Sequence, residues 1–160
     1  MLKLYKHTDK GLCYHEAWEA ASTIIEHWGL VGERGSTIEH PWNREKSAEE
    51  AIQEVLQVAE ADDFRPIDME DHHVLLIEYA IAGMGTRRDL TKRHQLEDRM
   101  NETLGWTGLG MCDGGSIGSG TMEACCLVVD FDIAKRTIEA DLAGTEFSDY
   151  TRIYNEGADD

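Results

Sequence analysis

Two short combinations of side chains have the types that chemistry at a site requires. Cys112 precedes Asp113, which puts a nucleophile beside an acid, and His72 and His73 directly follow Asp71. A catalytic thiol needs a positioned base, and no histidine lies near Cys112 in the sequence. Neighbouring histidines on a strand point to opposite faces of a sheet, so they are poorly placed to chelate one ion. We therefore expect a non-catalytic protein without a metal or a cofactor.

Glycines are concentrated in one segment, where seven of the 15 lie between Gly105 and Gly120. Such a density permits turns with positive φ and lets another molecule approach the bare backbone. The segment is not a P-loop, because no Lys-Ser or Lys-Thr follows the last glycine. Two interpretations remain open: a long hairpin with a bulge at the glycines, and a loop that contacts a peptide or a small molecule.

We predict that a partner binds to this segment, on an exposed loop over residues 113–119. Asp113 and Glu123 supply negative charge there, while Ser116 and Ser119 supply hydroxyl groups that donate hydrogen bonds. Exposed loops held on rigid elements are common places for binding. The four residues are the predicted partner-binding set.

The net charge of −17 restricts the class of partner. A surface this negative repels DNA, RNA and anionic lipid, and it attracts a basic protein, so we expect a basic partner and not a nucleic acid. Plain solubility is the alternative explanation of the charge. The one basic cluster could give nucleic acid a small foothold, although pairing with nearby acids, such as Arg93 with Glu97, is the stronger expectation. Its members are Arg87, Arg88, Lys92, Arg93 and His94.

A cytoplasmic location is the simplest expectation from the remaining composition. No apolar run approaches the roughly 20 residues that cross a bilayer, and the first residues alternate charged with apolar side chains, unlike a signal peptide. We expect buried free thiols at the four cysteines, which contain no CxxC pair. The sequence leaves the oligomeric state open.

The elements that position these residues form two groups. Residues 2–42 have the alternation and β-branched content of strands, with glycines at the last turn, although residues 16–27 also have apolar spacing that suits a helix. Ser47 and Glu50 form a capping box that begins a helix ending near residues 62–64. Residues 65–71 are the predicted linker, so we expect domains at 1–65 and 66–160.

The second group predicts the order βαββαβ. We expect strands at 72–81, 107–111, 122–129 and 150–154, with helices at about 90–104 and 133–142. This order is that of a ferredoxin-like fold, in which two helices cover one face of an antiparallel sheet. The predicted fold class is therefore α+β, with a small antiparallel sheet and a helix followed by a ferredoxin-like unit.

The segment Glu26–Ser36 resembles the signature turn of the WGR domain, a small β-rich module named for Trp-Gly-Arg. The resemblance is carried by Trp28-Gly29 and by Gly32-x-x-Gly35, and it extends over about residues 1–65. It implies that Trp28 lies in the core, that a helix follows the sheet, and that the module holds nucleic acid or docks a catalytic domain. Leu30 stands where the family has its arginine, which weakens the functional part of this expectation.

A second resemblance covers about Gly105–Asp130. Its Cys/Asp-Gly-Gly-x-x-Gly-x-Gly-x-Met pattern is similar to segments of small uncharacterised bacterial proteins, among them candidates for immunity partners of secreted toxins. It implies no catalytic residue. Three hypotheses follow: an acidic binding protein that neutralises a toxin or escorts a basic protein, a WGR-type accessory module in nucleic-acid metabolism, and a small enzyme that uses the glycine-rich segment with Asp113 or Cys112.

Overall fold

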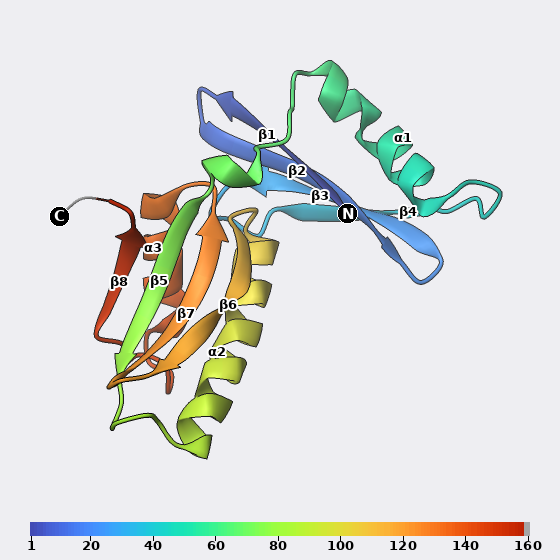
Figure 1. The fold of residues 1–160 in the computed structure, drawn as a ribbon. Coiled ribbons are helices and arrows are strands. Elements are labelled where there is room, and N and C mark those ends of the chain that lie inside the picture. Colours follow the sequence, from blue (N-terminus) through green and yellow to red (C-terminus); the bar gives the residue numbers. More distant parts are fainter. Residues whose placement is uncertain (159–160) are drawn as a thin grey trace. The chain divides into compact units, whose positions relative to one another are not determined.

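The computed structural model describes residues 1–158, which fall into two compact units with their boundary between Asp68 and Met69 (Figure 1). Each unit has one four-stranded antiparallel sheet, and the described chain contains three α-helices, so the protein is mixed α and β. The boundary lies slightly beyond the predicted one. Arg65 belongs to the first unit because it exchanges backbone hydrogen bonds of 2.7 and 2.9 Å with Tyr5.

The first sheet consists of four strands in sequence order. They are β1 (Leu2–Thr8), β2 (Gly11–Ala20), β3 (Thr23–Leu30) and β4 (Ser36–Pro41). The helical alternative for residues 16–27 is wrong, because the chain reverses at Ala21, whose φ is 47°, and Glu16 then lies opposite His27. Pairing on both sides of β2 and β3 outweighs the helical spacing of the alanines, since strand propensity depends on such neighbours.

The helix of this unit, α1 (Ala48–Ala61), begins as predicted. Ser47 accepts a hydrogen bond from the Glu50 amide, and the Glu50 side chain accepts one from the Ser47 amide, which completes the capping box. The apolar side of α1 packs on one face of the sheet and forms the core of the unit. That core contains Leu4, Ala17, Ile24, Ala51, Ile52, Leu56 and Ala59.

The second unit has the element order expected from the sequence, after a short 3-10 helix at Met69–Asp71. The elements are β5 (His73–Ala80), α2 (Arg87–Trp106), β6 (Gly110–Gly118), β7 (Thr121–Val128), α3 (Phe131–Leu142) and β8 (Arg152–Glu156). Helix α2 runs to Trp106, so the next strand begins later than we expected. The sheet order is β6-β7-β5-β8, and every neighbouring pair is antiparallel.

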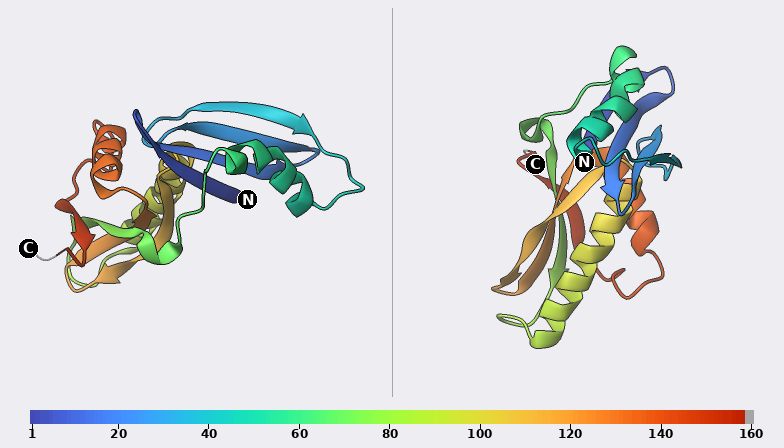
Figure 2. Two further views of the ribbon diagram at one scale, coloured as in Figure 1. Left: turned by 90° about the horizontal axis from the view of Figure 1, so that it is seen from above. Right: turned by 90° about the vertical axis from the view of Figure 1, so that its right-hand side faces the viewer.

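Helices α2 and α3 lie on the same side of this sheet (Figure 2). Strand residues alternate between the two faces, so one face of β5 and β7 is buried under the helices and the other is not. The covered face contains Leu75, Ile77, Tyr79, Met122, Ala124, Cys126 and Val128. We call the other face of this sheet the open face. Within residues 1–158, no helix is long and apolar enough to span a membrane.

Candidate functional site

The glycine-rich segment is a hairpin and not the exposed loop that we predicted over residues 113–119. Strand β6 continues to Gly118 and pairs with β7, with a bulge between Cys112 and Gly115 where Gly114 has a φ of 105°. A bulge accommodates an extra residue without ending the strand, so the glycines keep the chain in the sheet. The bulged-hairpin interpretation is therefore confirmed. The connection to β7 is only a tight turn at Ser119 and Gly120, whose φ angles are 54° and 87°.

Two of the four predicted partner-binding residues come together on the open face. Ser116 lies directly opposite Glu123, and its Oγ donates a hydrogen bond of 3.2 Å to Glu123 Oε2. Asp113 is exposed in the bulge and Ser119 is exposed in the turn, so they lie at other points of the hairpin. Sequence reasoning missed Tyr154 on β8, whose hydroxyl donates to Glu123 Oε1 at 2.9 Å.

The open face combines this hydrogen-bonded group with charges and with apolar side chains that range from buried to exposed. Arg152 binds Glu78 at 3.0 Å, and its guanidinium lies 3.9 Å from the centre of the Tyr154 ring. Desolvation and the hydrogen bond to Glu123 raise the pKa of Tyr154 to about 12, so its hydroxyl stays protonated and donates. Apolar side chains on the same face are Val74, Leu76, Met111 and Leu127, of which Met111 is 46% exposed.

Two of the five members of the basic cluster on α2 are paired with acidic side chains. Lys92 Nζ lies 2.6 Å from Asp149 Oδ1, and Arg93 Nε lies 3.0 Å from Glu97 Oε1. The second pair is the one that its i, i+4 spacing predicted. These contacts reduce the positive charge that the cluster can offer to a phosphate backbone.

A second group of ionisable side chains lies in the first unit, on the sheet face that carries α1. His15 Nε2 and His40 Nε2 lie 2.5 Å from the two carboxylate oxygens of Glu26. The three residues come from β2, β3 and β4, where each histidine is a diagonal neighbour of Glu26. They line a pocket of about 540 Å³, whose other walls are Ile24, Pro41, Asn43, Lys46, Ala51, Glu54, Val55 and Val58.

This trio was not predicted, because its members are far apart in sequence and only the strand register brings them together. Each carboxylate oxygen of Glu26 already has one imidazole partner. Within residues 1–158, no group of three or more histidine, cysteine, aspartate or glutamate side chains is arranged to hold a metal ion. The pocket is thus a cleft with polar and apolar walls, and its central carboxylate is already bound within the protein.

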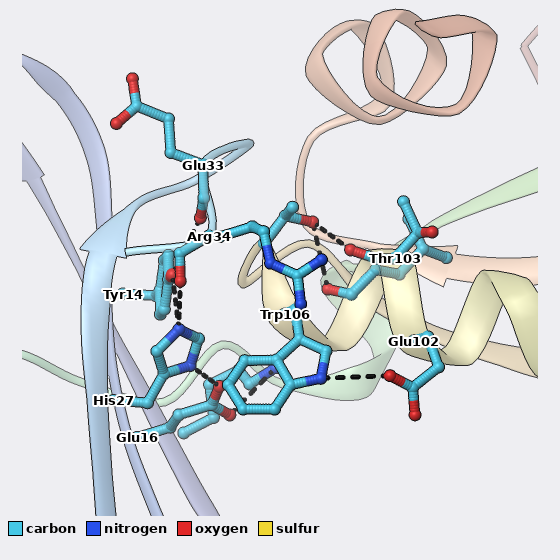
Figure 3. Close-up of polar contacts among 11 residues, drawn as sticks. Tyr14, Glu16, His27, Glu33, Arg34, Glu102, Thr103 and Trp106 are labelled. Carbon is cyan, nitrogen blue, oxygen red and sulfur yellow. Dashed lines mark hydrogen bonds and ion pairs between the residues drawn. The ribbon is translucent and has the colours of Figure 1, made fainter. Parts of the chain in front are cut away.

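A third group lies on the opposite face of the first sheet (Figure 3). His27 Nδ1 is 2.7 Å from Glu16 Oε1, and His27 Nε2 is 3.0 Å from the Tyr14 hydroxyl. Lys3 binds the other oxygen of Glu16 at 3.2 Å. A hydroxyl, an imidazole and a carboxylate in this order resemble the relay that activates a nucleophile. Tyr14 is only 1% exposed, and desolvation raises its pKa, so the hydroxyl keeps its proton out of reach of a substrate.

The turn between β3 and β4 supports this buried group. Gly35 has a φ of 64°, and a side chain there would overlap the carbonyl oxygen of Trp28. A Cβ on Gly29 would lie 3.0 Å from the Tyr14 hydroxyl, which donates to the carbonyl of Glu33 at 2.9 Å. The two glycines therefore permit a close backbone approach over Tyr14. Trp28 itself is 37% exposed, so the expectation that it lies in the core is wrong.

The four cysteines are free thiols, as expected, but only Cys126 is fully buried. Cys125 and Cys126 occupy opposite faces of β7, since the burial pattern of that strand alternates.

The chain matches no protein-family model, no curated protein and no solved structure.

Proposed function

We propose that this chain is a non-catalytic acidic binding protein, and that the open face of its second sheet binds a basic protein. The observation that carries the proposal is the group formed by Ser116, Glu123 and Tyr154, which presents a carboxylate on the same face of the sheet as exposed Met111. A flat face with apolar side chains around fixed polar groups has the composition of a protein-binding surface.

Charge supports a basic protein as the occupant of this face. The second unit carries 18 acidic and 8 basic side chains, a net charge of −10. A field of this sign speeds the encounter with a basic protein and disfavours nucleic acid. The resemblance of Gly105–Asp130 to candidate immunity proteins favours a toxin as that partner, and the free thiols favour the reducing cytoplasm as the location.

Two finer fold assignments belong to the same proposal. The order β6-β7-β5-β8, the antiparallel pairing and the two helices on one face support a ferredoxin-like second unit. The glycine turn after Trp28 and the helix that follows the sheet support a WGR-like first unit. These assignments are independent of the partner's identity.

The test is capture of a partner by the tagged full-length chain from an extract of its own cells at physiological salt, followed by affinity measurement. We expect a basic protein, and we expect Glu123→Lys to weaken the complex at least tenfold, which corresponds to about 1.4 kcal/mol. Asp98→Lys makes the same charge change at an exposed position on α2 and should leave the affinity nearly unchanged.

Equal loss of affinity in both variants would reduce the proposal to general electrostatic attraction. Unchanged affinity in Glu123→Lys, with the sheet intact by circular dichroism, would remove the open face as the binding surface. Failure to capture any basic protein would count against the function itself.

A WGR-type accessory module in nucleic-acid metabolism is the second candidate, favoured by the turn over Gly29 and Gly35. Binding to short DNA duplexes at physiological salt, weakened by charge reversal of Arg87 and Arg88, would support it. Both arginines are exposed on the first turn of α2. The absence of binding at low salt, where electrostatic contacts are strongest, would exclude this role.

A further inference from the structure

Two cysteines of the second unit face each other across the hairpin. Cys112 on β6 is the direct partner of Cys126 on β7 in the antiparallel register, so both side chains project from the same face of the sheet. This pairing depends on the bulge, which shifts the register immediately after Cys112.

The hydrogen-bond pattern shows which of the two kinds of antiparallel pair Cys112 and Cys126 form. It is the kind with the shorter Cα–Cα distance. The Val129 amide donates to the Leu109 carbonyl at 2.9 Å, and hydrogen-bonded and non-hydrogen-bonded pairs alternate from there along the ladder. Cys112 and Cys126 are then a non-hydrogen-bonded pair. In agreement, the Cys112 amide points away from β7 and donates to Asn101 Oδ1 at 3.0 Å.

This position is compatible with a covalent link. Residues in a non-hydrogen-bonded pair have Cα atoms about 4.5 Å apart, and disulfides span Cα separations of about 4.4–6.8 Å. A bond between Cys112 and Cys126 therefore needs rotation of the side chains and little movement of the backbone. Cys125 offers no such partner, because it projects from the open face.

The two thiols differ in access and in acidity. Cys112 is half-exposed on an edge strand, whereas Cys126 is 0% exposed. The neighbouring Cys126 thiol and the backbone of Gly114 lower the pKa of Cys112, although burial, Glu97 and Asp113 oppose the shift. The neighbouring Cys112 thiol and burial raise the pKa of Cys126. The accessible thiol is thus the better nucleophile, with a second thiol beside it, which is the arrangement of redox-sensitive cysteine pairs.

We propose that Cys112 and Cys126 form a reversible intramolecular disulfide when the protein meets a hydroperoxide. The Cys112 thiolate attacks one oxygen of hydrogen peroxide, the O–O bond breaks, and the departing hydroxide takes the thiol proton to become water. Cys112 is then a sulfenic acid. Cys126 attacks its sulfur, the S–O bond breaks, and the oxygen leaves as a second water with the proton of Cys126. Two thiols lose two electrons, and one peroxide becomes two waters.

The link would connect the edge strand β6 to the central strand β7 immediately before the bulge that carries Asp113. It would restrict opening of the hairpin, because a covalent bond reduces the conformational freedom of the open chain. The site is independent of the proposed partner, since it lies on the helix-covered face of the sheet.

The test treats the reduced full-length protein with stoichiometric hydrogen peroxide and maps its cysteines by mass spectrometry without reduction. We expect a single link between Cys112 and Cys126, loss of two hydrogen atoms from the intact mass, slower amide exchange in β6, and full reversal by dithiothreitol. Cys125→Ser is the matched control and should form the same link. Cys112→Ser should leave Cys126 reduced.

A further variant separates the two chemical steps. Cys126→Ala should accumulate a sulfenic acid at Cys112 that dimedone traps, and circular dichroism checks that this core variant is folded. If Cys126→Ala does not fold, the Cys112→Ser and Cys125→Ser pair still decides the question. Retention of all four thiols in the wild-type protein, or a link through Cys125 or between two molecules, would overturn the proposal.

Discussion

The two sheets use different side chains on their central strands. In the first unit, β2 and β3 have a carboxylate–imidazole contact on each face: Glu16 with His27 on one, and Glu26 with His15 on the other. In the second unit, the covered face of β5 and β7 consists of apolar side chains and one thiol, with the hydroxyl of Tyr79 bound to a backbone carbonyl. The central strands of the first sheet thus carry paired polar side chains in addition to their apolar core residues, whereas the covered face of the second sheet is almost entirely apolar.

The difference concerns how each sheet specifies its register. A buried polar group costs free energy unless it is hydrogen-bonded, so each carboxylate–imidazole contact of the first sheet favours the one alignment that satisfies it. The second sheet obtains its alignment from shape, because its apolar side chains must fit beneath α2 and α3. Removal of a side chain should therefore leave an unpaired charge in one unit and a cavity in the other.

The largest effect is expected for Glu16→Ala in the first unit. Loss of the Glu16 carboxylate removes a partner of both His27 and Lys3. Breaking a buried pair costs about 3–5 kcal/mol of the free energy of unfolding. Urea unfolding, with amide exchange of β2 and β3 to locate the change, measures the loss. Glu19→Ala is the control on the same strand, since Glu19 is exposed. A loss similar to that of the control would show that the pair contributes only marginally.

The corresponding substitution in the second unit is Leu75→Ala. Leu75 is fully buried on the covered face of β5, and its truncation should cost about 2–5 kcal/mol through lost burial and a cavity. Amide exchange should increase in β5 and β7 while β2 and β3 remain protected. Val74→Ala, at the neighbouring position on the open face, should cost less. Equal losses at Leu75 and Val74 would show that both faces are packed alike.

A smaller effect on the free energy of unfolding should be the same in both units, because α1 and α2 both begin with a capping box. Ser47 caps α1 and Thr86 caps α2, each within a capping box. Replacement of either by alanine should cost about 1 kcal/mol of the free energy of unfolding, measured in urea. Ser22→Ala and Thr91→Ala are exposed controls outside the caps. A clear difference between the two caps would extend the contrast between the sheets to the helices.

The smallest effect concerns the acidic partners in these boxes, Glu50 and Asp89. Hydrogen bonds from Ser47 and Thr86 lower the pKa of Glu50 and of Asp89 respectively. A lowered pKa in the folded state gives stability that is present above the unfolded pKa and is lost as the pH falls through the folded one. Melting temperatures measured between pH 6 and pH 3 should therefore decrease less in Glu50→Gln than in the wild type. An unchanged slope would mean that the carboxylate charge does not contribute.

Local signals predicted the helices well but left two interpretations of the glycine-rich segment open. Ser47 and Glu50 lie within one turn of each other, so the start of α1 could be inferred directly from the sequence. For the glycine-rich segment the sequence left a bulged hairpin and a contact loop both open, and the partner site was predicted on an exposed loop over residues 113–119. Pairing with β7 and the bulge after Cys112 decided for the hairpin, because they compensate for the low strand propensity of glycine.

The sequence by itself determined the order of the elements, the negative charge and the capping box of α1, because these depend on composition or on residues a few positions apart. Only the tertiary structure decided which distant side chains meet. Glu26 lies between His15 and His40, and Cys112 lies opposite Cys126, because of the register of neighbouring strands. A shift of one residue in that register would move each of these side chains to the other face of its sheet. Register depends on the summed packing and hydrogen bonding of whole strands, and no short motif encodes it.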